Sequence, residues 1–152
     1  MEKDSIIKLI SIENKENILT TIGKQFVFSR SFSSKDMEVF AQLTGDNNPI
    51  HQSEEFAKLS IFKHRIVPGV LLMSMFSKIF GTLPGNTGIY IFQSCKFIKP
   101  VYLDETVKAI VELTSVDKIK SVGIFSTKCF NEKKELVPFG DAKIKFPQII
   151  FN

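Results

Sequence analysis

The segment from Ile66 to Phe80 is the most apolar stretch of this 152-residue chain. Pro68 and Gly69 mark its beginning and Gly81 its end, as expected at the two ends of a helix. Its apolar side chains cover nearly every side of a helix, which predicts a helix that is buried all round. In a chain of this size such a helix is most economically the central one, and the remaining segments must surround it.

Most of the other regular segments alternate between apolar and polar residues, as half-buried strands do. In Thr106–Thr114 the apolar residues fall on one face, and Lys108 and Glu112 lie on the other. Strand character is also present in Lys24–Phe32, Gly88–Phe97, Val122–Phe130 and the alternating residues Ala142, Ile144 and Phe146, with a hairpin turn at Asn131–Lys134. This order of elements predicts an α+β fold, an antiparallel sheet packed on a central helix.

Length and composition predict one globular domain over residues 1–152. Within it, residues 1–23 are expected to form a weakly specified N-terminal arm, and Leu83–Asn86 is expected to be a loop. The net charge of +4 is mild and its lysines are spread along the chain, so no nucleic-acid surface is expected. The apolar segment is interrupted by Ser74, Ser77 and Lys78, and it is too short and too polar to span a membrane.

Cys95 and Cys129 are the two cysteines of the chain, and no secretory signal or transit peptide is recognisable at its start. We therefore expect a cytoplasmic protein whose thiols are reduced, buried and inert.

A short helix is expected from Ser33, where Asp36 completes a capping box, to Gly45, which is a natural helix stop. A second short helix, Glu54–Leu59, is capped by Ser53 and carries acidic residues in its first turn, where the helix dipole favours them. His51 is expected in the turn that joins the two helices.

The joining segment contains an acid and an imidazole five residues apart, Asp46 and His51. Pro49 has no backbone donor and keeps Asn48 out of helical geometry, so the segment is expected to bend. A tight bend could direct both side chains at one small volume, as general acid–base catalysis requires. The alternative is an ordinary loop in which the histidine is a polar residue satisfied within the protein.

The run Phe40–His51, with Gly45-Asp46-Asn47-Asn48-Pro49-Ile50-His51 as its specific element, resembles the signature of the MaoC-like, or type 2, enoyl-CoA hydratases and 3-hydroxyacyl-thioester dehydratases. Arg65–Leu71 resembles the start of that family's buried helix, and the similarity extends over roughly residues 25–147. The resemblance implies the hotdog fold, an antiparallel sheet wrapped around a long central helix.

The resemblance also implies a reaction, the reversible syn addition of water to a trans-2-enoyl thioester to give the (R)-3-hydroxyacyl thioester. The expected substrates are thioesters of CoA or of acyl-carrier protein, and neither a cofactor nor a metal is expected. Asp46 and His51 match the catalytic pair, although which of them accepts and which supplies the proton stays open. Gly69 matches the backbone donor to the thioester oxygen, while Asn48 and Pro49 shape the loop.

Ser77 matches a position that lines the substrate pocket, and the alternative for it is a helix serine that bonds its own backbone. Pro68 stands where the family commonly has histidine, a departure that a helix start tolerates. His64 matches no family site and is expected on a surface loop.

Two other functions remain alternatives, a hotdog acyl-CoA thioesterase and a non-catalytic acyl-thioester-binding module. A sheet wrapped on one helix leaves an edge and a face uncovered, so a homodimer or a higher homo-oligomer is expected.

Overall fold

The computed structural model describes residues 21–83 and 88–147. The predicted N-terminal arm as far as residue 20, and the predicted loop beyond Leu83, lie outside the described residues. The elements in chain order are β1 (Gln25–Arg30), α2 (Ser34–Thr44), α3 (Pro49–Gln52), α4 (Glu54–Leu59), α5 (Gly69–Phe80), β2 (Ile89–Gln93), β3 (Lys96–Phe97), β4 (Val107–Asp117), β5 (Val122–Phe130) and β6 (Leu136–Lys145).

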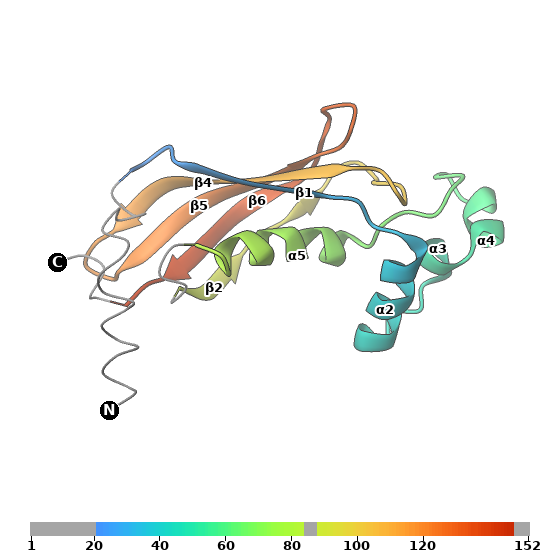
Figure 1. Ribbon diagram of the computed structural model, residues 1–152, viewed down its shortest axis with the longest axis horizontal. Helices are drawn as coiled ribbons and strands as arrows, with labels where there is room; N and C mark the ends of the chain where they lie inside the picture. The colour runs from blue at the N-terminus through green and yellow to red at the C-terminus, as the bar shows by residue number, and fades with distance from the viewer. Residues whose placement is uncertain (1–20, 84–87, 148–152) are drawn as a thin grey trace.

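The strands form one antiparallel sheet in the order β1-β4-β5-β6-β2, with β3 also paired to β6 (Figure 1). The expected alternation is confirmed in β4, because Val107, Ala109, Val111 and Leu113 are all fully buried while Lys108 is exposed. The bounds predicted for β5 are those observed, and β4 runs three residues beyond Thr114, the predicted end.

Helix α5 lies along one face of the sheet (Figure 1), where it contacts β1, β4 and β6. The residues that it buries are Leu72, Met75, Phe76, Ile79 and Phe80, which join the inner face of the sheet in one core. Complete burial of each such side chain contributes roughly 1.5–3 kcal/mol. The predicted central helix is thus confirmed. The prediction that it is buried on every side is wrong for the single chain, since Val70 keeps 64% of its surface exposed. The sheet covers one side of the helix and leaves the other uncovered.

The run Gly88–Phe97 was expected as one strand, and it is two, β2 and β3. The break lies where the backbone of Ser94 crosses β6 at close range, since a Cβ built on Gly140 would lie 1.9 Å from the Ser94 carbonyl oxygen. The Ser94 hydroxyl also accepts a hydrogen bond from the Asp141 N–H at 2.9 Å. Gly140 has no side chain, and this lets the backbone of Ser94 approach closely. Such a contact between distant segments is visible only in the tertiary structure.

Helices α2, α3 and α4 form a group beyond one end of the sheet (Figure 1). The capping box of α2 is confirmed, because the Ser33 side chain accepts from the Asp36 N–H while the Asp36 side chain accepts from the Ser33 N–H. Ser53 caps α4, also as predicted. Across the ranges 21–83 and 88–147, no helix has the length and apolarity that crossing a membrane requires.

Candidate active site

Asp46 directly follows the residue that ends α2. Gly45 has φ +79°, a left-handed conformation that suits glycine, and its N–H donates to the Ala41 carbonyl to close the helix. The Asp46 N–H then donates to Thr44 Oγ1 at 3.1 Å, and Asp46 Oδ1 accepts from the Asn48 N–H, also at 3.1 Å. These bonds fix the backbone on both sides of a half-buried carboxylate.

His51 lies in α3, a helix of four residues, so the expectation that it sits in a turn between two helices is wrong. Asn48 caps this helix, with Oδ1 accepting from the Ile50 N–H at 3.2 Å, and Pro49 occupies the first turn, where no donor is needed. The Asn48 carbonyl accepts from the His51 N–H at 3.0 Å. Asn48 is therefore bonded to both Asp46 and His51, and it couples the two residues through the backbone.

His51 is 9% exposed, and its Nδ1 lies 2.7 Å from the Ile66 carbonyl oxygen. A carbonyl oxygen can only accept, so Nδ1 carries the hydrogen and donates it. In the neutral ring Nε2 is then unprotonated and available as a proton acceptor.

Gly69 is the first residue of α5, and Pro68 is its N-cap. The Pro68 carbonyl accepts from the N–H groups of Leu71 and Leu72, which leaves the N–H groups of Gly69 and Val70 without a partner inside the helix. A Cβ at Gly69 would lie 2.6 Å from the Phe97 ring, so the aromatic side chain packs where a larger residue would stand. Pro68 is buried and does not prevent the helix from beginning with this free amide.

Ser77 is not brought together with the other predicted residues. It lies eight residues along α5 from Gly69, about 12 Å at the rise of an α-helix, and its side chain is exposed.

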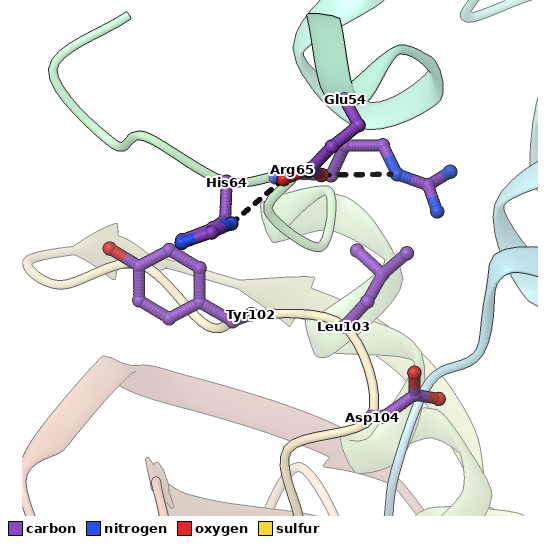
Figure 2. Close-up of a pocket in the computed structure, with 6 residues that line it drawn as sticks. All are labelled: Glu54, His64, Arg65, Tyr102, Leu103 and Asp104. Atoms are coloured by element: carbon purple, nitrogen blue, oxygen red, sulfur yellow. Dashed lines mark hydrogen bonds and ion pairs between the residues drawn. The ribbon is translucent and has the colours of Figure 1, made fainter. Parts of the chain in front are cut away.

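An open pocket of about 380 Å³ is present among the described residues, and the side chains that line it are drawn in Figure 2. None of the predicted site residues lines it; its walls are Glu54, His64, Arg65, Tyr102, Leu103 and Asp104. His64 is exposed, as expected for a loop residue, and its Nδ1 lies 2.7 Å from Glu54 Oε1. The hydrogen bond from His64, followed by that from the Arg65 N–H, lowers the pKa of Glu54 below its ordinary value.

Sequence reasoning missed Glu54 and Arg65 as partners, because they are eleven residues apart and joined by a loop. In the sequence, Glu54 stands out only by its place in the first turn of a helix. The helix dipole favours an acidic residue there, so this position does not indicate a bond to Arg65.

Both thiols are free. Cys129 is fully buried, and burial raises its pKa to about 12; Cys95 is partly buried, and its pKa is raised for the same reason. Among the described residues, no group of three or more histidine, cysteine, aspartate or glutamate side chains could hold a metal ion.

Comparison with known proteins gives consistent matches over most of the chain. The family model described as "MaoC like domain" matches residues 17–132. An (R)-specific enoyl-CoA hydratase of Aeromonas caviae is 35% identical over 83% of this chain and 95% of its own. A mitochondrial 3-hydroxyacyl-[acyl-carrier-protein] dehydratase of Arabidopsis thaliana is 35% identical over 86% of this chain and 80% of its own.

Among solved structures, the (R)-hydratase from A. caviae involved in PHA biosynthesis superposes with a TM-score of 0.81 at 35% identity, covering 84% of this chain and 97% of that one. The expected hotdog architecture is confirmed by this likeness and by the observed sheet and helix. With a family model matched over residues 17–132 and relatives of this identity and coverage, the chain belongs to the MaoC-like domain family.

Proposed function

We propose that this protein is a hydro-lyase that catalyses the reversible hydration of trans-2-enoyl thioesters to (R)-3-hydroxyacyl thioesters in fatty-acid metabolism. The substrates are thioesters of CoA or of acyl-carrier protein, the two classes named for its relatives. The observation that carries the proposal is the 2.7 Å contact between His51 Nδ1 and the Ile66 carbonyl, from which we infer the tautomer of His51. The Asp46 carboxylate is coupled to the same residue through Asn48.

In the hydration direction, His51 Nε2 accepts a proton from water while the oxygen of that water forms a bond to C3. The electron pair of the double bond moves toward the thioester carbonyl, and the proton now on Nε2 is delivered to C2 on the same face. Asp46 accepts a hydrogen bond from the water and stabilises the imidazolium that forms. Delivery of both hydrogen and hydroxyl from one side accounts for syn addition.

The thioester oxygen gains negative charge as the bond to C3 forms. The free N–H of Gly69 at the start of α5 is a suitable donor to it, since the N-terminal end of a helix carries partial positive charge. We propose that Ser77 lines the substrate pocket. It does not act together with the Gly69 N–H, because about two helical turns separate the two residues.

We also propose a homodimer as the working form. Strand β2 is the last in the sheet order, and it and its neighbours present exposed apolar side chains, those of Ile89, Ile91, Phe92, Phe97 and Ile98. A second copy that covers this edge would also close the space over the uncovered side of α5, where Val70 is exposed. Replacing Ile91 with lysine should shift the mass measured by light scattering toward the monomer.

The two unbridged cysteines support a reducing compartment, and we propose the cytoplasm as the location.

The decisive experiment follows the loss of enoyl-thioester absorbance after trans-2-enoyl-CoA is added, with chiral analysis of the product. We expect absorbance loss, a product of R configuration, and the reverse reaction from the (R)-3-hydroxyacyl-CoA. Release of free thiol from a saturated acyl-CoA would instead identify a thioesterase, and saturable binding without turnover would identify a binding module. Either result would reject the proposal.

A further inference from the structure

Glu54, at the start of α4, holds the segment that leads to the carbonyl partner of His51. Its Oε1 lies 2.7 Å from His64 Nδ1, and its Oε2 accepts from the Arg65 N–H at 3.3 Å. The Arg65 Nε lies 3.8 Å from the same Oε2, within range of an ion pair (Figure 2). One carboxylate therefore fixes two successive residues of the loop.

Arg65 extends this contact to the other two short helices. Its Nη1 donates to Ser34 Oγ at 3.2 Å and to the Gln52 carbonyl at 3.4 Å, at the beginning of α2 and the end of α3. With Glu54 included, the guanidinium touches all three helices of the group. Its Nε is buried and ion-paired but lacks a hydrogen-bond partner.

The residue after Arg65 is Ile66, whose carbonyl accepts the hydrogen of His51 Nδ1. The Ile66 N–H in turn donates to the Ile50 carbonyl at 3.4 Å, so the loop and α3 are bonded at two successive residues of the helix. The Val67 N–H, which belongs to the same peptide group as the Ile66 carbonyl, donates to the Val101 carbonyl at 2.8 Å. The contacts at Arg65 on one side and this bond on the other together place the acceptor that selects the tautomer of His51. Misplacement of a catalytic group by about 1 Å can cost on the order of 100-fold in rate.

We propose that Glu54 and Arg65 are positioning residues for His51: they hold the Ile66 carbonyl in place, and this keeps the hydrogen on Nδ1 and Nε2 free to accept a proton. The proposal rests on the proposed function for its kinetic consequence, but its structural content, the tautomer of His51, does not depend on any activity. Neither residue touches the reacting atoms in this role.

The variants are Arg65→Met, which keeps an unbranched apolar stem but removes the guanidinium, and Glu54→Gln, which keeps its shape but removes the charge. Arg65→Lys retains a charge that can reach one partner but not three. Glu55→Gln is the matched control, because Glu55 is in the same helical turn, is exposed, and has a side-chain bond to Ser53. All four are compared with the unchanged protein by thermal melting.

The first readout is the tautomer of His51, measured by NMR of the ¹⁵N-labelled imidazoles. The chain has two histidines, so one further variant, His64→Gln, assigns both rings. We expect His51 to be protonated on Nδ1 in the unchanged protein and in Glu55→Gln. We expect a mixture of tautomers, or a broadened Nδ1–H signal, in Arg65→Met and Glu54→Gln.

The second readout is steady-state kinetics with an enoyl-CoA. A group that only positions the base should lower kcat by about 10- to 100-fold and leave KM within about threefold. Arg65→Lys should fall between Arg65→Met and the unchanged protein. A residue that only stabilises the fold would change the melting temperature without changing the tautomer.

Unchanged tautomer and unchanged kcat in folded Arg65→Met and Glu54→Gln would overturn the proposal. If Arg65→Met does not fold, Glu54→Gln and Arg65→Lys decide the question by the same two readouts. If the unchanged protein proves to have no hydratase activity, the proposed function fails, and the NMR result alone then supports or overturns the positioning of His51.

Discussion

His51 Nδ1 lies 2.7 Å from the carbonyl oxygen of Ile66, a residue fifteen positions further along the chain. This hydrogen bond orients the imidazole from the side opposite to Nε2. Two separate segments therefore form the site, because the histidine lies in α3 and its acceptor lies in the loop before α5.

Replacing His51 with asparagine should leave the protein folded and nearly inactive. The asparagine amide can still donate toward the Ile66 carbonyl but has no group in the place of Nε2. Loss of a general acid–base group typically costs about 10²–10⁴-fold in rate, and Asp46→Asn should lose activity to a similar extent. The absorbance assay with an enoyl-CoA measures both. Glu38→Gln, at an exposed position of α2, is the control; full activity in either site variant would contradict the assignment.

Replacing Gly69 with alanine should slow the reaction by about 10-fold or more, because the methyl group would displace the Phe97 ring beside the free amide. Phe97 is 49% exposed, so its ring can move and the fold should survive. Kinetics of Gly69→Ala, Phe97→Ala and the double variant separate the causes. If the ring is responsible, the double variant should match Phe97→Ala alone; a double variant as slow as Gly69→Ala would exclude that explanation.

Truncating Phe76 to alanine should lower the free energy of unfolding by about 3–5 kcal/mol, since the side chain is fully buried between α5 and the sheet. Chemical denaturation measures the change. Leu43→Ala is the matched control, because Leu43 is 84% exposed and its loss should change the free energy of unfolding by less than about 0.5 kcal/mol. Equal effects at the two positions would mean that α5 is not in the core.

Replacing Asp36 with asparagine should destabilise the protein at neutral pH but not in acid. The hydrogen bond from the Ser33 N–H is the largest cause that lowers the pKa of Asp36 below its ordinary value. The Ser33 hydroxyl and Arg30 lower it further. A lowered folded-state pKa contributes stability above the unfolded pKa, about 3.9 for aspartate, and this contribution is lost as the pH falls through the folded value. Melting curves of both proteins from neutral pH downward should therefore converge in acid; a constant difference would contradict the assignment to ionisation.

The two thiols should differ in reactivity toward a disulfide reagent in the native protein. Cys95 is partly buried and should react first, whereas Cys129, fully buried and with its pKa raised to about 12, should react only as the protein unfolds. Cys95→Ser should abolish the fast phase, and Cys129→Ser should leave it intact. A fast phase that survives Cys95→Ser would show that Cys129 is accessible.

The local features of this chain were determined by the sequence alone. The capping box at Ser33, the stop at Gly45, the start of α5 at Gly69 and the alternation of β4 each depend on residues within one or two turns or on one strand, so their pattern predicts them. The element Gly45–His51 likewise indicated the family, because Asp46 and His51 are close in sequence. Here the structure adds distances to what the residues already indicated.

Tertiary structure decided the features that join distant segments. The uncovered side of α5, the division of 88–97 into two strands at Gly140, and the contacts among Glu54, Arg65 and Ile66 that hold His51 all arise from neighbours with no fixed spacing in the chain. A single sequence records which side chains are apolar or polar. Which of them meet, and therefore which nitrogen of His51 is free to take a proton, is settled when the loop before α5 packs against α3.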